Sequence, residues 1–317
     1  MAETTAALNL ILHQYDFSSY AEKVRLVLGL KQLAWQAVAI PAYAPKPDYT
    51  PLTAGYRRTP ALQIGADVYC DTRLIVALLE QIAPTPSLYP GPDPAHARAR
   101  CEALLPWAEA QLFWPVARYI TAIHAGRFAP EFHADRALLH GKRQPTTAQV
   151  AASARHFLAQ IAPQLAWLED LLVGGQDFLL GDQPSLADFA LFEAPWFLET
   201  IDGPAQRALR LPRTRAWMER VAAIGHGTCA PLPAAGALAV ARAAEPLPCP
   251  PSHYLAPEGV VIGEAVTVSP FDQHSPAHGT LAYVDAERIT LACTSAATGA
   301  LAVHFPRLGY RLSRARQ

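Results

Sequence analysis

The first 83 residues alternate between apolar runs of strand length and an apolar spacing typical of helices. Residues 8–13 and 35–40 are two such runs. Between them, Ser18 or Ser19 offers a helix N-cap. The apolar face of the helix that would follow consists of Ala21, Val24, Val27 and Leu28. The pattern therefore predicts a β-α-β unit at the start of the chain.

A hairpin and a second helix follow this unit. Residues 61–64 and 68–70 are short apolar runs separated by a Gly-Ala-Asp loop, which suits a hairpin. Asp71 or Thr72 then supplies a side-chain oxygen at the start of a helix with regular apolar spacing. A β-α-β unit followed by β-β-α is the order of a thioredoxin-like fold, so we expect an α/β domain over residues 1–83.

A Pro/Gly-rich linker over residues 83–94 marks the first domain boundary. Long helical patterns then cover residues 95–124 and 147–173, and two prolines should kink or break the first of them. Ser185 and Asp188 have the spacing of a capping box at the start of a further helix. An all-helical second domain is therefore expected over residues 95–225.

The last part of the chain changes character twice. Residues 226–257 are rich in Ala and Pro and read as a linker around a short helix. Residues 258–317 contain alternating β-branched and apolar residues between glycines, which predicts a small β-rich, barrel-like module. Its histidines, among them His304, match no metal-ligand spacing, so we expect no metal site.

Composition narrows the class of protein. A length of 317 residues predicts two or three domains, and a net charge of −1 gives no electrostatic case for nucleic acid or membrane binding. No stretch approaches the ~20 apolar residues of a membrane span. The five cysteines form no paired motif, and no basic segment typical of a signal peptide precedes the first apolar run. We therefore expect a cytoplasmic protein.

The segment around the hairpin has features that suit a peptide-like ligand. Thr59-Pro60 stands at the entrance of the hairpin, where a cis bond would turn the Thr59 backbone outward, beside the free N–H groups of a helix start. This arrangement resembles the glutathione site of glutathione transferases, in which Glu-Ser or Gln-Ser stands where this chain has Asp71-Thr72. The resemblance implies that Thr59, with a cis Pro60, pairs with the cysteinyl backbone of glutathione. It also implies that Asp71 and Thr72 hold the γ-glutamyl end.

The first predicted helix carries a second resemblance. Residues 17–25, FSSYAEKVR, resemble the serine-type start of bacterial and tau-class glutathione transferases, and the omega-class version in which a cysteine replaces the serine. Ser18 falls at the catalytic position in both comparisons, although Ser19 replaces the usual proline. A hydroxyl at a helix N-terminus can donate a hydrogen bond to a thiolate, which the helix dipole also favours. A plain N-cap is the alternative role of Ser18, and Tyr15 is the second choice for the thiolate donor.

Residues 181–188, GDQPSLAD, resemble the helix-nucleating motif of the transferase C-terminal domain. The whole resemblance implies a homodimeric detoxification enzyme that conjugates glutathione to a small hydrophobic electrophile. Trp107 and Trp114 would lie against that electrophile. Arg57 and Arg58 would either pair with the glycyl carboxylate or remain solvated. The alternative is a non-catalytic scaffold that acts through the C-terminal β module.

Overall fold

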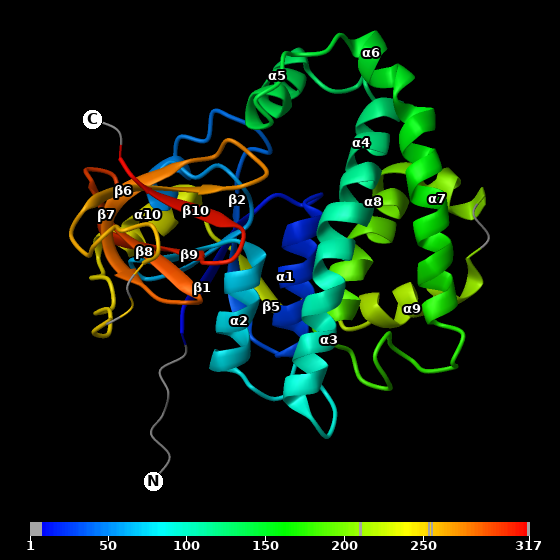
Figure 1. Cartoon of the computed structure of the whole chain (residues 1–317), viewed down its shortest axis with the longest axis horizontal. Coiled ribbons are helices and arrows are strands. Elements are labelled where there is room, and N and C mark those ends of the chain that lie inside the picture. The colour runs from blue at the N-terminus through cyan, green and yellow to red at the C-terminus, as the bar shows by residue number, and fades with distance from the viewer. Residues whose placement is uncertain (1–7, 209–210, 253, 255, 316–317) are drawn as a thin grey trace.

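The structure is a computed structural model that describes residues 8–208, 211–252, 254 and 256–315. Residues 1–7, which belong to the segment considered above for a signal peptide, lie outside these ranges. The strands of the C-terminal module lie on one side of the N-terminal domain, and the long helices lie on its other side (Figure 1). Within the described ranges, no helix is long and apolar enough to span a bilayer.

The N-terminal part has the thioredoxin-like order that the sequence predicts. Its elements are β1 (Leu10–Gln14), α1 (Ser19–Leu30), β2 (Ala34–Ala39), the 3-10 turn η1 (Thr50–Thr53), β3 (Ala61–Ile64), β4 (Asp67–Cys70) and α2 (Thr72–Ile82). β1 is parallel to β2 and antiparallel to β3, which pairs with β4. Because successive side chains point to opposite faces of a strand, Leu10 and Leu12 join the core on one face and Ile11 joins the core on the other.

The second part is all-helical, as predicted. Its elements are α3 (Pro94–Pro106), the π-helical segment η2 (Trp107–Leu112), α4 (Phe113–Ile123), α5 (Pro130–Leu139), α6 (Thr147–Ala152), α7 (Ala154–Leu171), α8 (Leu186–Ala208) and α9 (Pro212–Ala222). Pro106 and Pro115 were expected to kink or break the first long helix. The chain stays helical, and the regular α-helix is interrupted by a π segment that lies between these two prolines.

Asp188 ties the start of α8 to two other segments. Its carboxylate accepts hydrogen bonds from the backbone N–H groups of Ser185 at 2.9 Å and Leu179 at 2.8 Å. It also accepts the Ser185 hydroxyl at 2.7 Å and the indole N–H of Trp217 at 2.9 Å. The capping box that the sequence predicts at Ser185 and Asp188 is therefore part of a larger buried hydrogen-bond network.

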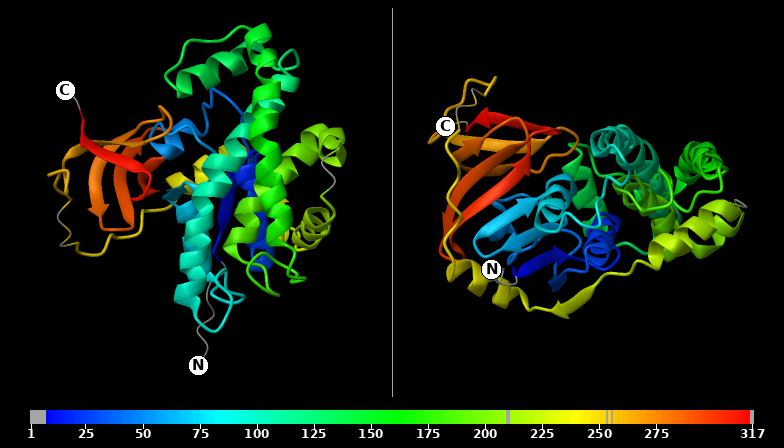
Figure 2. Two further views of the ribbon diagram at one scale, coloured as in Figure 1. Left: turned by 45° about the vertical axis from the view of Figure 1, so that its right-hand side comes forward. Right: turned by 90° about the horizontal axis from the view of Figure 1, so that it is seen from below.

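The C-terminal strands continue the N-terminal sheet. The remaining elements are β5 (Thr228–Pro231), α10 (Ala234–Arg242), β6 (Ala265–Pro270), β7 (Ala277–Val284), β8 (Arg288–Ser295), β9 (Gly299–Pro306) and β10 (Tyr310–Arg314). Within the described residues, one sheet has the order β10-β6-β7-β8-β9-β4-β3-β1-β2-β5 (Figure 2). The expected linker thus contains β5, which is parallel to β2, and α10, which packs on the sheet. Its Ala/Pro-rich composition gave no sign of a strand.

The seam between β4 and β9 joins the two parts of the sheet. The strands are parallel, with Asp67, Val68 and Tyr69 opposite residues 302–304. His304 contacts Asp67 at 2.9 Å through Nε2 and stacks on the Tyr69 ring at 4.4 Å. Burial lowers the pKa of His304, although the hydrogen bond to Asp67 opposes the shift. This histidine therefore has a structural role in the seam.

Replacing Asp67 with alanine should weaken this seam strongly. The substitution removes the buried partner of His304 and the acceptor of the Leu247 N–H at 2.9 Å. We expect the free energy of unfolding to fall by about 3 kcal/mol, measured by urea denaturation. Asp48→Ala, at an exposed position, is the control and should change it by less than about 0.5 kcal/mol. Equal unfolding midpoints for Asp67→Ala and the wild type would contradict this account of the seam.

Candidate active site between the two domains

A cavity of about 790 Å³ lies between the N-terminal domain and helices α4 and α5. We call it the serine cavity because Ser18 lines it. Tyr15, Thr59 and Trp114, which the sequence also singles out, line the same cavity. Its volume lies within the range of roughly 300–1,000 Å³ that is usual for small-molecule sites. The fold therefore brings four predicted site residues to one cavity.

Ser18 is the N-cap of α1 and is 4% exposed. Its hydroxyl oxygen accepts the Ala21 N–H at 3.2 Å. Within the described residues, the hydroxyl makes no hydrogen bond as a donor, so its proton is available to a ligand in the cavity. Capping and donation to a ligand are therefore compatible roles for this residue.

Thr59 lines the same cavity and lies directly before Pro60. The Thr59-Pro60 peptide bond is cis. Neither the N–H nor the C=O of Thr59 hydrogen-bonds to a described residue, although the residue is half-buried. Since buried backbone groups are nearly always paired, this pair of groups can bind the backbone of an extended ligand.

Lys46 is a site residue that the sequence analysis missed. It lines the cavity at 6% exposure, and its ammonium group donates to the Thr59 hydroxyl at 3.0 Å and to the Arg57 carbonyl at 3.1 Å. No described carboxylate forms an ion pair with it. Burial, and then the charges of Arg136 and Arg57, lower its pKa to about 7. A bound anion would relieve this unfavourable charge.

Asp71 is held by a residue from the far end of the chain. Its φ of 76° lies in the left-handed region, which non-glycine residues rarely adopt and which is frequent at functional sites. Its carboxylate accepts the Arg73 N–H at 2.9 Å and the Tyr310 hydroxyl at 2.8 Å. Burial, and then the charge of Asp71, raise the pKa of Tyr310, so this hydroxyl stays protonated and donates. Tyr310 begins β10, so the C-terminal strands take part in this region.

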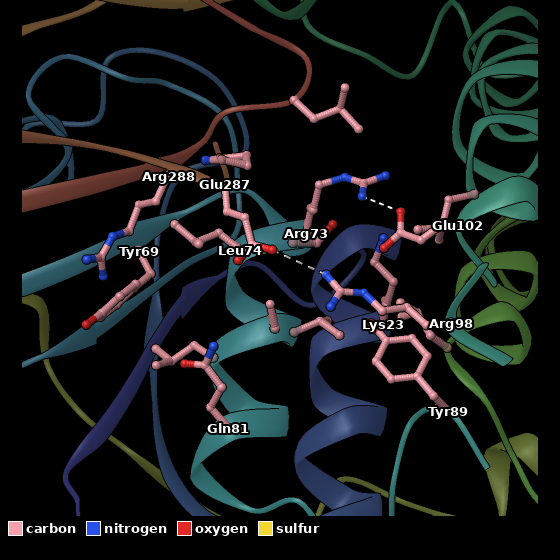
Figure 3. A pocket seen from close by; sticks show the side chains of 18 of the residues that line it. Lys23, Tyr69, Arg73, Leu74, Gln81, Tyr89, Arg98, Glu102, Glu287 and Arg288 are labelled. Carbon is pink, nitrogen blue, oxygen red and sulfur yellow. Dashed lines mark hydrogen bonds and ion pairs between the residues drawn. The ribbon is translucent and has the colours of Figure 1, made fainter. Parts of the chain in front are cut away.

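A second cavity of about 400 Å³ lies beside α2 and α3, and we call it the α2–α3 cavity (Figure 3). Thr72 lines this cavity and not the serine cavity, and Asp71 lines neither. Three cations of the α2–α3 cavity have acidic partners, whereas Arg288 forms no ion pair with a described residue and lies over the Tyr283 ring. The pairs are Lys23 with Glu109, Arg73 with Glu102 and Arg98 with Glu287. The Asp71-Thr72 pair expected for the γ-glutamyl end is thus not part of the lining of the serine cavity.

Trp107 does not reach the serine cavity, in contrast to the expectation that it lies with Trp114. Its indole N–H donates to Gln164 on α7 at 2.9 Å, and its ring lies 6.4 Å from that of Trp167. Residues seven apart share a face of a regular α-helix. The π segment between the two tryptophans changes the helical phase, so only Trp114 faces the cavity.

Both arginines that precede Thr59 line the serine cavity, and each has an acidic partner. Arg57 forms an ion pair with Asp135 of α5, and Arg58 forms one at 3.0 Å with Asp272 in the loop after β6. They are therefore not simply solvated. Among the described residues, no group of acidic, histidine or cysteine side chains has the arrangement of a metal site.

Comparison with known proteins identifies the family. A crystal structure of a GST-like protein from Pseudomonas syringae is 35% identical, with a TM-score of 0.75 over 97% of this chain and 100% of that one. The chain belongs to the glutathione S-transferase family. The profile of the glutathione S-transferase N-terminal domain matches residues 12–87, and that of the C-terminal domain matches residues 95–220. The Pseudomonas alignment is long enough to include the C-terminal strands.

More distant transferase structures share the fold alone. The β-etherase LigF from Sphingobium sp. strain SYK-6 is 22% identical, with a TM-score of 0.52 over 68% of this chain and 96% of its own. A glutathione S-transferase III in its apo form is also 22% identical, with a TM-score of 0.50 over 77% of this chain and 100% of its own. A comparison with curated protein sequences gives no match.

Lys46 predicts a distinctive pH dependence of stability. Its pKa of about 7 in the folded chain lies below the ordinary value of 10.5, so between these values the unfolded chain binds more protons. The contribution of Lys46 to the free energy of unfolding must therefore rise as the pH increases from about 7 to 10.5. We compare the wild type with Lys46→Met by urea unfolding at about pH 6.5 and about pH 9.5. Relative to Lys46→Met, the wild type should gain more than about 1 kcal/mol in its free energy of unfolding between the lower and the higher pH. If the difference between the two proteins is the same at both pH values, the Lys46 pKa is not lowered.

Proposed function

We propose that this family member is a glutathione transferase in which Ser18 stabilises the thiolate of glutathione. The observation that carries the proposal is the meeting of Ser18, the open Thr59 backbone and the unpaired Lys46 in one cavity. The cysteinyl backbone of glutathione pairs with Thr59, and the glycyl carboxylate binds Lys46. The resulting position of the sulfur is beside the Ser18 hydroxyl, at the N-terminus of α1.

The reaction needs one proton transfer and one bond exchange. The thiol loses its proton to solvent, and the Ser18 hydroxyl and the helix dipole stabilise the thiolate that remains. The thiolate sulfur then donates an electron pair to an electrophilic carbon. In the case of an aryl halide, the halide leaves with the electrons of its bond to that carbon. Holding both reactants together supplies much of the acceleration.

The C-terminal strands form part of the proposed site. Tyr310 donates to Asp71, and Gln273 of the loop after β6 lines the serine cavity. We assign Asp71 and Thr72 to the γ-glutamyl end, with Tyr310 as a positioning residue for Asp71. A role as a non-catalytic scaffold therefore has less in its favour, because the module faces the site.

Location and assembly remain proposals. All five cysteines are free thiols, which suits a cytoplasmic protein because that compartment is reducing. A homodimer is proposed on family resemblance, and the mass of the protein in solution would test it.

Removal of the Ser18 hydroxyl should abolish most turnover. With glutathione and an aryl halide, we expect Ser18→Ala to lower kcat/KM by about a hundredfold, because a donor to the developing anion is lost. Ser18→Gly lacks the same hydroxyl but keeps a tolerated N-cap, so it should lose the same activity with less loss of stability. Ser18→Thr keeps the hydroxyl and should retain much more turnover.

Two further measurements decide the role of Ser18. Tyr15→Phe should keep turnover within about twofold of the wild type. Binding of S-methylglutathione, measured by calorimetry, should survive Ser18→Ala, because that analogue has no thiol. Full turnover by Ser18→Ala together with loss in Tyr15→Phe would move the thiolate donor to Tyr15. A wild-type chain that binds no S-methylglutathione would contradict the proposed function itself.

Tyr310→Phe tests the contribution of the C-terminal strands. Loss of one hydrogen bond to Asp71 should raise the KM for glutathione by about threefold to tenfold, with a smaller effect on kcat. Tyr283→Phe is the matched control, since the Tyr283 hydroxyl donates to Asp285 within the module at 2.8 Å and does not contact Asp71. Equal KM values for Tyr310→Phe and the control would remove Tyr310 from the site.

A further inference from the structure

Two helices present matching stripes of rings and cations to the serine cavity. The lining residues of the α4 stripe are Trp114, Arg118 and Thr121, and those of the α5 stripe are Phe132, Arg136 and the C-cap residue His140. Residues spaced by three or four share a helical face, so each stripe is one continuous side of its helix. The stripes lie in the helical domain, whereas Ser18 and Thr59 belong to the N-terminal domain.

The charge of these stripes is not balanced by the protein. None of the described residues that line the cavity is an aspartate or a glutamate. Neither Arg118 nor Arg136 forms an ion pair with a described residue. The Arg136 guanidinium donates to the Ala42 carbonyl at 3.0 Å and lies 4.9 Å above the Phe132 ring, while that of Arg118 lies 6.0 Å above the Phe157 ring.

The two arginines that precede Thr59 in the chain differ from those of the stripes. Arg57 and Arg58, which precede Thr59, have Asp135 and Asp272 as partners. In the α2–α3 cavity, Arg73 and Arg98 also have acidic partners, whereas Arg288 has none among the described residues. Within the serine cavity, Arg118 and Arg136 therefore differ from Arg57 and Arg58 in having no carboxylate partner among the described residues.

Two histidines on the same walls indicate an unfilled polar surface. Nε2 of His124 is buried and makes no hydrogen bond within the described residues. Burial, and then the positive charges of Arg118 and Lys142, lower the pKa of His140, whose ring lies 5.3 Å from that of Trp114. Because buried polar atoms are normally paired, an anionic ligand with acceptor atoms would complete this surface.

We propose that the α4–α5 side of the serine cavity binds the second substrate as an aromatic anion. Its ring lies against Trp114, and its carboxylate or sulfonate binds Arg118 and Arg136 through charge-assisted hydrogen bonds. This proposal rests on the proposed function, since it names the class of electrophile that meets the glutathione thiolate. It replaces the purely hydrophobic electrophile expected from family resemblance with one that carries a negative charge.

The test compares two probes that differ in one charge. A chlorodinitrobenzoate is an aromatic electrophile with a carboxylate, and the corresponding carboxamide has nearly the same shape without the charge. Calorimetry with the full chain and saturating S-methylglutathione measures the binding of each probe and needs no turnover. We expect the benzoate to bind about tenfold more tightly than the carboxamide, and this preference should fall at high salt.

Variants of Arg118 and Arg136 test whether these two arginines cause the preference for the benzoate over the carboxamide. Arg118→Gln and Arg136→Gln should each reduce the preference for the benzoate by about threefold or more, while carboxamide binding stays the same. Arg155→Gln, at an exposed position of α7 outside both cavities, is the matched control and should leave the preference intact. Repeating the titration without S-methylglutathione shows whether the anion site is independent of the glutathione site.

The outcomes separate this proposal from the proposed function. Equal affinity for both probes, no binding of either, or an unchanged preference in both arginine variants would overturn the anionic electrophile. None of these results would affect S-methylglutathione binding or the role of Ser18. Conversely, the wild-type chain could prefer the benzoate and yet fail to bind S-methylglutathione. This result would support the anion site and contradict the transferase proposal.

Discussion

Positive charge that lacks carboxylate partners is the constraint on which the serine cavity depends. A buried ammonium group loses its hydration, and this loss is costly unless an anion compensates for it. Lys46 has no such anion among the residues that the structure describes, and burial together with neighbouring cations lowers its pKa. The fold tolerates the buried Lys46 ammonium group because Lys46 lines a cavity, where a bound anionic ligand can supply the missing negative charge.

The C-terminal strands are the second part of the arrangement. Parallel pairing of β9 with β4 brings β10 next to the start of α2, and this places the Tyr310 hydroxyl on Asp71. The Tyr310 hydroxyl also lies 2.5 Å from that of Tyr56, which precedes Arg57 and Arg58. The added strands thus stabilise the two segments on either side of the β3–β4 hairpin. This explains how an extension at the end of the chain can act on a site near its beginning.

Sequence patterns of a few residues predicted the helix starts and the turn before the hairpin, because these features depend on neighbouring residues. Helix capping predicts Ser18 as the N-cap of α1, and the spacing of Ser185 and Asp188 predicts the start of α8. In each of these cases, the interacting residues lie within a few positions along the chain. The strand pattern of the C-terminal module was predictable for the same reason. The proposed roles of Ser18 and Thr59 in glutathione binding come from the family resemblance.

The contacts that sequence analysis missed join distant segments. Lys46 lies in a proline-rich loop, and nothing in its neighbourhood shows that its ammonium group is buried. The pairing of β4 with β9 spans more than half the chain, so Tyr310 could not be placed beside Asp71. The π segment alters the helical phase, so the placement of Trp107 away from the serine cavity was not predictable from regular helical spacing. The stripe on α5 was available in principle, since Phe132 and Arg136 are four residues apart, but that helix was not predicted.

The most direct test of the account is a crystal structure of the protein with glutathione. We predict that the cysteinyl part of the tripeptide lies in the serine cavity, with its sulfur within hydrogen-bonding distance of the Ser18 hydroxyl and its backbone paired with Thr59, while the γ-glutamyl end extends toward Asp71 and Thr72. One of its carboxylates should contact the Lys46 ammonium group. A sulfur bound at Tyr15, or glutathione bound outside this cavity, would contradict the account.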